Sequence, residues 1–360
     1  MHLTSEISPE TAWMLFRRSG RHLLDVIFPF EPLESVSKFD RYSHALYASV
    51  HLSRIRKFIF YLEPGDDAKH LTRIFSEPAP NLWSLEFATP LPEGGTIPFP
   101  HLFGLEFPKL RVLVVTGVGP WPEVVGANLT RITFNISLDL RVLKRCIPYS
   151  PNLKVLKIQG ISVFKKSDLS KWRKIILPPG VRLSILYLRV PYSRILTLFT
   201  LPRDGQITVT LPLGMPPHIP LLSYTLPLET SHLQNLGALT RLHIRAHFDL
   251  SISLELKCFR LDRPAFEVDV MCSRENKTMS QPETSLAMRL LGNLDRIVLT
   301  GVEELRMEGF IGNLEPQPPE LLAFLERMPA LRRVITTNGN EEIFCSALNS
   351  LGCRAAVIRV

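Results

Sequence analysis

Two histidines in the stretch HIRAH, His243 and His247, are the first residues of this sequence whose spacing could support chemistry. Histidines four residues apart bind one metal ion when both lie on the same face of a helix. The surrounding LTRLHI instead alternates in the manner of a strand, in which positions i and i+4 lie about 13 Å apart. We therefore expect no metal ion at this pair.

Other residues that could take part in catalysis do not form a known catalytic pattern. GVGPWPEVVG contains glycines but lacks the Lys-Ser/Thr step of a phosphate-binding loop, and neither GxSxG nor HExxH occurs. We therefore predict a protein that is not an enzyme, with no catalytic, cofactor-binding or metal-binding residues and no cofactor. The scattered thiols form no CxxC pair, which is typical of reduced cysteines in a cytoplasmic or nuclear protein; they are Cys146, Cys258, Cys272, Cys345 and Cys353.

Membrane insertion and secretion are not expected from the sequence. The N-terminal MHLTSEISPETAW carries acidic residues and has no apolar core of a signal peptide. The longest apolar runs, such as RVLVVTGV, are far shorter than a membrane span.

Basic side chains are the remaining candidates for a binding site. The chain has 42 Lys and Arg against 34 Asp and Glu, a net charge of +8. If alternate residues of the predicted strands face outward, basic residues outnumber acidic ones on that face. The expected basic stripe, a candidate partner-binding site, consists of Arg131, Lys157, Arg189, Arg241 and Arg245. The alternative is that long cationic side chains simply lie well on a solvated strand face.

The elements that would hold these cations recur along the chain. SPNLKVLKIQG, residues 150–160, has the form Leu-x-x-Leu-x-Ile, and its β-branched and aliphatic neighbours predict a short strand with Leu153, Leu156 and Ile158 pointing inward. The leading leucines of five such units are separated by 28, 19, 24 and 30 residues. Similar units are APNLWSLEF, FPKLRVLVVTGV, ANLTRITF, GVRLSILYL, GALTRLHI, GNLDRIVLTGV and MPALRRVITTNG.

Helical patterns occupy several of the intervals between these strands. LDLRVLKRCI, PELLAFLERM and EEIFCSALNSLG place apolar residues at helical spacing, and the last ends at a glycine stop signal. DDAKHLTRIF and DLSKWRKII are similar. A unit of helix, turn and short strand, about 20–30 residues long, is typical of leucine-rich repeats.

We therefore predict an α/β leucine-rich-repeat solenoid, with short parallel strands on the concave side and helices on the convex side. An ordinary α/β sheet with alternating strands and helices is the alternative, and the irregular spacing favours it. We expect one irregular repeat domain over residues 1–360, with an N-terminal capping region over 1–65 and β-rich irregular repeats over 191–290. Residues 272–284 are expected to form a loop.

At the level of pattern, the chain resembles fungal F-box-like leucine-rich-repeat proteins. The resemblance rests on PNLKVLKIQG, PKLRVLVVTG and PALRRVITTNG, and on WMLFRRSGRHLLDVIF near the N-terminus. In that family a Trp-Leu-x-Arg-Ser segment follows the F-box, and the matching residues here are Trp13, Arg18, Ser19, Leu24 and Asp25. The F-box itself, which docks on the adaptor of a ubiquitin ligase, is not found in the residues before Trp13. We therefore do not expect the chain as given to bind that adaptor.

Two functions follow from these observations. The first is a non-enzymatic protein-interaction module, a relative of F-box-like substrate receptors that captures a protein partner on its repeat surface. The alternative is a binder of nucleic acid or another phosphate-rich ligand through a basic concave face. Of the two we expect a protein partner, whose identity the sequence does not reveal, rather than nucleic acid or a membrane.

Overall fold

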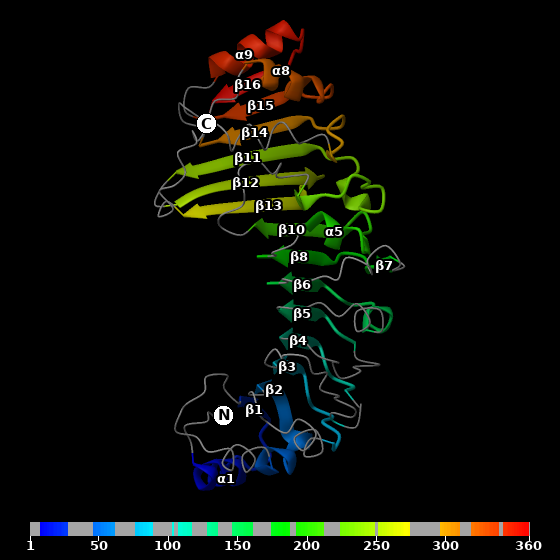
Figure 1. Cartoon of the computed structure of the whole chain (residues 1–360), viewed down its shortest axis with the longest axis vertical. Coiled ribbons are helices and arrows are strands. Elements are labelled where there is room, and N and C mark those ends of the chain that lie inside the picture. The colour runs from blue at the N-terminus through cyan, green and yellow to red at the C-terminus, as the bar shows by residue number, and fades with distance from the viewer. Residues whose placement is uncertain are drawn as a thin grey trace. The chain divides into compact units, whose positions relative to one another are not determined.

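A computed structural model of the chain describes residues 8–27, 46–61, 76–88, 103, 107–116, 128–135, 146–160, 174–187, 192–211, 224–248, 251–273, 296–309, 318–337 and 341–359. The chain divides into two compact units, Met1–Ile161 and Ser162–Val360. Fourteen described strands belong to a large, mostly parallel sheet that is not closed, six in the first unit and eight in the second (Figure 1). The predicted α/β class is confirmed in this form.

The first unit begins with helix α1 (Pro9–Arg18). Ser8 caps this helix by accepting a hydrogen bond from the Thr11 backbone N–H, and Pro9 suits its first turn because no partner for an N–H is needed there. Six parallel strands follow in sequence order. They are β1 (Leu24–Ile27), β2 (Ile55–Tyr61), β3 (Ser84–Ala88), β4 (Val112–Thr116), β5 (Arg131–Asn135) and β6 (Val155–Gln159), with short 3-10 turns η1 (Leu52–Arg54) and η3 (Ile147–Tyr149).

The core of the first unit is built from side chains that stack in register from strand to strand. One fully buried row is Phe58, Leu85, Leu113, Ile132 and Leu156. The second is Phe60, Phe87, Val115, Phe134 and Ile158. The predicted inward positions Leu153, Leu156 and Ile158 are confirmed, since each is at most 1% exposed. Each strand alone would leave these rows open, so neighbouring strands complete each other's core.

A second stack lies just before the strands and is polar. Asn81 donates from Nδ2 to the Ser53 carbonyl (2.7 Å) and accepts from Lys109 Nζ (2.6 Å). Farther along, Asn152 donates to Asn128 Oδ1 (3.0 Å). Each of these four residues immediately precedes the first leucine of its unit, as in PNL, PKL, ANL and PNL. They hold successive turns together where the backbone is not paired as a strand.

The second unit contains the longer strands. Its large sheet consists of β8 (Arg182–Leu186), β10 (Gln206–Leu211), β11 (Arg241–Phe248), β12 (Ser251–Arg260), β13 (Arg263–Ser273), β14 (Glu304–Glu308), β15 (Arg333–Thr336) and β16 (Ala356–Arg359). A separate two-stranded sheet pairs β7 (Ile175–Ile176) with β9 (Phe199–Thr200). The helical elements are α5 (Tyr192–Leu196), η5 (Gln234–Leu236), α8 (Pro318–Glu326) and α9 (Glu341–Ser350).

The strand order in this unit departs from sequence order. It runs β8-β10-β13-β12-β11-β14-β15-β16, because an antiparallel three-strand meander is inserted into an otherwise parallel sheet (Figure 1). The turn from β12 to β13 places Leu261 and Asp262 at φ of +48° and +28°. Such values suit a two-residue hairpin turn but are strained for residues with a Cβ.

Most of the predicted elements are present in the described residues. Strand-like QITVTLP, SISLELKCF and FEVDV fall in β10, β12 and β13. Helices α8 and α9 occupy the predicted PELLAFLERM and EEIFCSALNSLG, and Gly352 at φ +63° follows the end of α9. His243 and His247 both lie in β11, so their assignment to a strand is confirmed.

Three sequence-based assignments are wrong. In DLSKWRKII, Ile175 and Ile176 form strand β7 rather than helix. In GNLDRIVLTGV, residues 296–301 do not form a strand, and β14 begins only at Glu304. With Leu183 as the leading leucine of GVRLSILYL, the repeat pattern predicts that Ile185 faces outward, but Ile185 is buried beside Val209 of β10. The reason is that Leu183 fills the second inward position of its unit rather than the first. The residues of β8 that the pattern assigns to the outer face therefore point into the core.

Other predictions lie outside the described residues. These are the helix DDAKHLTRIF, most of the helix LDLRVLKRCI, the loop after Ser273 and the candidate binding residue Arg189.

Candidate functional site

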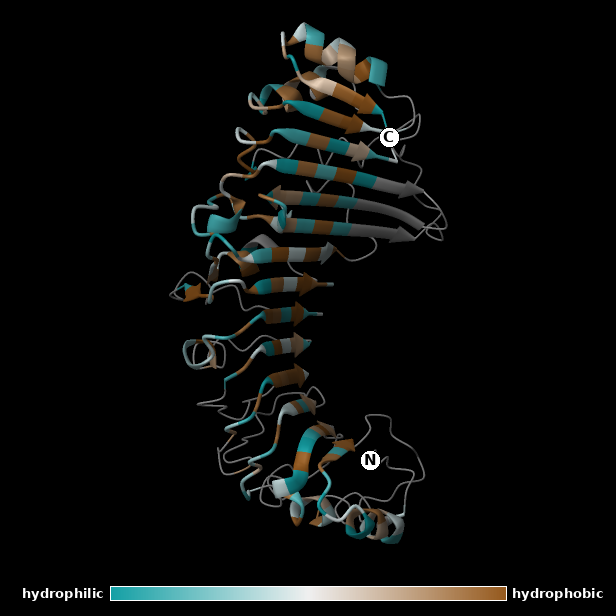
Figure 2. Cartoon of the chain, turned by 180° about the vertical axis from the view of Figure 1, so that it is seen from behind, coloured by the Kyte–Doolittle hydropathy of each residue, from teal (hydrophilic) through white to brown (hydrophobic). Residues whose placement is uncertain are grey.

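The site with the densest polar chemistry is one face of the meander and its neighbour β14. Where the side chains of β11 to β14 are described, buried apolar residues alternate with residues that are mostly charged, as the alternating colours along these strands show (Figure 2). We call these charged side chains the charged face; they are Arg241, His243, Arg245, Glu255, Lys257, Glu267, Asp269, Glu304, Arg306 and Glu308. Because side chains alternate across a sheet, one face of four adjacent strands presents them all together.

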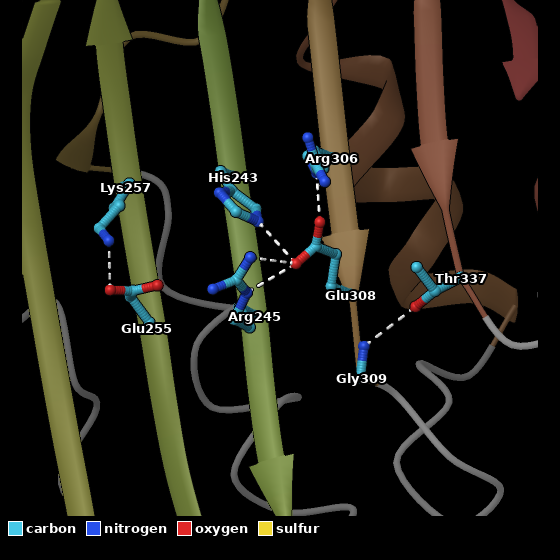
Figure 3. Close-up of polar contacts among 8 residues, drawn as sticks. All are labelled: His243, Arg245, Glu255, Lys257, Arg306, Glu308, Gly309 and Thr337. Atoms are coloured by element: carbon cyan, nitrogen blue, oxygen red, sulfur yellow. Dashed lines mark hydrogen bonds and ion pairs between the residues drawn. The ribbon is translucent and has the colours of Figure 1, made fainter. Parts of the chain in front are cut away.

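Glu308 is the centre of the half of the charged face on β11 and β14. Its carboxylate accepts from Arg245 Nε at 2.6 Å and from Arg306 Nε, and it lies 3.4 Å from His243 Nε2 (Figure 3). Its side chain is only 12% exposed. Burial raises the pKa of this carboxyl, but hydrogen bonds from Arg245 and Arg306 outweigh burial and hold the pKa below its usual value. Glu308 is therefore an ionised group that fixes two guanidinium groups.

His243 lies among these charges with a side chain 16% exposed. Burial lowers its pKa, Glu308 opposes that change, and the nearby Arg245 and Arg306 reinforce it, so that the net pKa is lowered. A neutral imidazole is the favoured form near pH 7.

Lys257 is the centre of the other half, on β12 and β13. Its ammonium group contacts Glu255 and lies 3.2 Å from Glu267 (Figure 3 shows the contact with Glu255). Burial lowers the pKa of Lys257, but the two carboxylates raise it by more, so that the net pKa is raised. The lysine therefore remains charged and bridges the two strands.

Three carboxylates surround this lysine. Oxygens of Glu255, Glu267 and Asp269 lie within 4.8 Å of one another, and all three residues are partly buried. Burial, followed by repulsion from Glu267 and Glu255, raises the pKa of Asp269 to about 6. Three carboxylates at this spacing can hold a cation. Here the Lys257 ammonium already neutralises two of them, because it contacts Glu255 and Glu267.

Further ion pairs continue the pattern at the edges of the face. Arg241 NH2 lies 2.9 Å from Asp262 Oδ1, and its guanidinium covers the Phe259 ring. Arg333 on β15 lies 3.0 Å from Glu304. Most cations of this face thus already have an acidic neighbour within the protein.

The described residues of the predicted basic stripe are divided between the two units. Arg131 and Lys157 lie in the first unit, and Arg241 and Arg245 lie in the second. In the first unit the two cations occupy different rows, since Arg131 lies opposite Val155 while Lys157 lies opposite Thr133. Arg241 and Arg245 share β11, and each has an acidic partner.

The carboxylates and Lys257 of the charged face were not singled out as functional residues in the sequence. A signal for them exists, because SLELKCF and FEVDV alternate apolar and charged residues, which places the charges on one face of each strand. What the sequence does not show is that these two strands lie between β10 and β11, next to the basic residues.

No protein-family model matches this chain, and a search of curated proteins found no relative. Among the described residues, no helix is long and apolar enough to cross a membrane.

Proposed function

We propose that this chain is a non-enzymatic protein-interaction module, and that the charged face of the second unit binds its protein partner. The supporting observation is the balance of charge on this face. Arginine or lysine side chains pair with carboxylates at 2.6–3.2 Å in the contacts around Glu308, Glu267, Glu304 and Asp262. Such a mixed face suits a protein surface with its own mixture of charges.

The finer architecture is part of the same proposal. Stacked apolar rows and the polar stack of Asn81, Lys109, Asn128 and Asn152 support a leucine-rich-repeat-like arrangement in the first unit. The resemblance to fungal F-box-like repeat proteins would make the partner a substrate protein presented to a ubiquitin ligase. In that case the chain supplies recognition and another component supplies the chemistry.

A matched pair of variants tests this proposal. Glu267→Gln with Arg306→Gln removes one negative and one positive charge from the charged face with little change in shape. Lys154→Gln with Glu342→Gln makes the same change in net charge at two exposed positions, before β6 and in α9, that are not part of the charged face. Partners are first captured by chemical cross-linking of the purified chain in an extract, and each recovered protein is then titrated directly against all three chains.

The proposal expects a direct partner whose affinity falls at least about tenfold with the face variant, which corresponds to about 1.4 kcal/mol. The control variant should bind like the unmodified chain. A confirmed direct partner that binds both variants equally well would show that the charged face is not the binding surface.

Binding of nucleic acid or another phosphate-rich ligand is the second candidate. Arg131 is exposed at the start of β5 and has no ion pair with a described residue, so it remains a cation that a phosphate could contact. Titration of a short single-stranded oligonucleotide separates the two functions. A steep, log-linear loss of affinity with added salt supports the oligonucleotide as a ligand, and undetectable binding at low salt removes this candidate.

A further inference from the structure

We infer that the charged face binds a helical segment of the partner that carries a basic and an acidic side chain two turns apart. This inference rests on the proposed function and adds the chemistry and geometry of the bound segment. It follows from how charge is distributed over the strands of the meander.

The charge of the face changes sign between the two outer strands of the meander, β13 and β11. On β13, Glu267 and Asp269 carry two negative charges. On β11, Arg241 and Arg245 carry two positive charges, and His243 between them has a lowered pKa. The neighbouring β14 adds Arg306, Glu304 and Glu308, so that β11 and β14 together keep one net positive charge. The intervening strand β12 contributes Glu255 and Lys257, whose charges cancel. The strand register places both side chains on the same face as those of β11 and β13. A partner that complements the face must therefore be basic over β13 and acidic over β11.

The groups on both outer strands retain capacity for a partner. Among the described residues, no side chain is in an ion pair with Asp269, and its carboxyl lies beside those of Glu255 and Glu267. Arg241 pairs with Asp262, whose side chain is 93% exposed, so this contact lies at the solvent and can be exchanged for one with a partner. A guanidinium has five N–H donors, so Arg241 and Arg245 can each donate a hydrogen bond to a further carboxylate or other acceptor.

The distance between the two strands selects the form of the bound segment. β13 and β11 both pair with β12, so they are separated by two strand spacings, or about 10 Å. Seven residues of an α-helix rise about 10.5 Å and return to nearly the same face. In an extended segment, three residues span about 10 Å but their side chains point to opposite sides. A helix with opposite charges at positions i and i+7 therefore matches the face best.

Designed helical peptides test this geometry without altering the protein. Three alanine-rich, fluorescently labelled peptides are compared by anisotropy at low salt, and their helicity is checked by circular dichroism. The first carries Lys and Glu seven residues apart, on one face. The second carries them nine residues apart, on opposite faces, and the third replaces Glu by Lys at the seven-residue spacing. Peptide direction need not be controlled, because a helix can lie either way across the strands.

The expected result is that the first peptide binds at least about threefold more tightly than either of the others, since only it satisfies both charged strands. Added salt should remove the difference, because the Debye length falls to about 3 Å at 1 M salt. A double variant, Glu267→Gln with Asp269→Asn, should also abolish the preference, provided that its melting curve shows a folded chain.

Equal binding of the first and second peptides would overturn the inference, as would tighter binding of the doubly basic peptide or of an oligonucleotide. Because the decisive comparison is between peptides, a destabilised protein variant cannot obscure it. These outcomes leave the proposed function separately testable: a captured partner that loses affinity with the Glu267→Gln and Arg306→Gln variant would still place protein binding on this face, with a different geometry.

Discussion

Asp269 lies directly opposite Glu255 across the antiparallel pair of β12 and β13, so two carboxylates face each other on adjacent strands. Like charges at such cross-strand positions destabilise a sheet. Lys257 compensates part of the repulsion, because it contacts Glu255 and Glu267, but Asp269 remains the group with the raised pKa. We therefore expect the stability of the second unit to depend on pH through Asp269 and its neighbour Glu255.

The first prediction concerns this pair. A folded-state pKa of about 6 for Asp269 exceeds the ordinary 3.8, so the folded state binds more protons between these values. The free energy of unfolding should therefore fall as the pH rises from about 4 through about 6. Asp269→Asn removes the carboxylate, and should stabilise the chain at pH 8 by about 1–3 kcal/mol relative to the unmodified chain.

Urea unfolding of both chains at several pH values measures this difference. Below the ordinary pKa, where Asp269 is protonated in both states, the gain from Asp269→Asn should vanish. Asp204→Asn, at an exposed position before β10, is the matched control for the loss of one carboxylate. An unchanged gain across the whole pH range would contradict the assignment to Asp269.

The second prediction compares two neighbouring residues of β6. Leu156 is fully buried in a stacked row beside Ile132, so Leu156→Ala should cost about 2–5 kcal/mol through lost burial and a cavity. Lys157 points to the other face and is half-buried, so Lys157→Ala should cost less than about 0.5 kcal/mol. Denaturant midpoints measure both, and comparable losses would contradict the assignment of the two faces.

The third prediction concerns the turn between β12 and β13. Leu261 and Asp262 both have positive φ, which Asn and Gly adopt at lower cost. Replacing them together by Asn and Gly should raise the free energy of unfolding by about 1–2 kcal/mol. The lost contact between Asp262 and Arg241 is at an exposed carboxylate and should offset little of this gain.

Thermal or urea unfolding detects the change. Leu261→Ala serves as the control, because alanine retains the Cβ and with it the strain at positive φ. If Leu261→Ala stabilised the chain as much as the double replacement, relief of an exposed apolar side chain rather than of backbone strain would explain the gain.

The fourth prediction concerns the polar stack of the first unit. Asn81 both donates to the Ser53 carbonyl and accepts from Lys109, so Asn81→Ala should cost about 1 kcal/mol. Asn81→Asp keeps the acceptor but removes the donor, and places a carboxylate beside a carbonyl oxygen. It should therefore fail to restore stability, and full recovery in equilibrium unfolding would show that the contact with Ser53 contributes nothing.

The repeated inward positions could be predicted from the sequence because they depend on local spacing. In SPNLKVLKIQG the separation of Leu153, Leu156 and Ile158 is enough to assign them to the core, and all three are buried. The same reasoning fails at GVRLSILYL, where Leu183 resembles a leading leucine but occupies the next inward position. One misplaced residue exchanges the two faces of a strand, and only packing against Val209 reveals which alternative is adopted.

The sequence by itself determined the α/β class, many of the strand segments, helices α8 and α9, and the alternation that puts charges on one side of β12 and β13. Tertiary structure decided which strands became neighbours, because pairing across the meander depends on contacts between residues far apart in the chain. Arg245 and Glu308 are 63 residues apart and meet only because β14 pairs with β11 rather than with β13. The predicted basic residues of β11 consequently lie among carboxylates, and the charge of the face is balanced by strand order, which local sequence patterns do not encode.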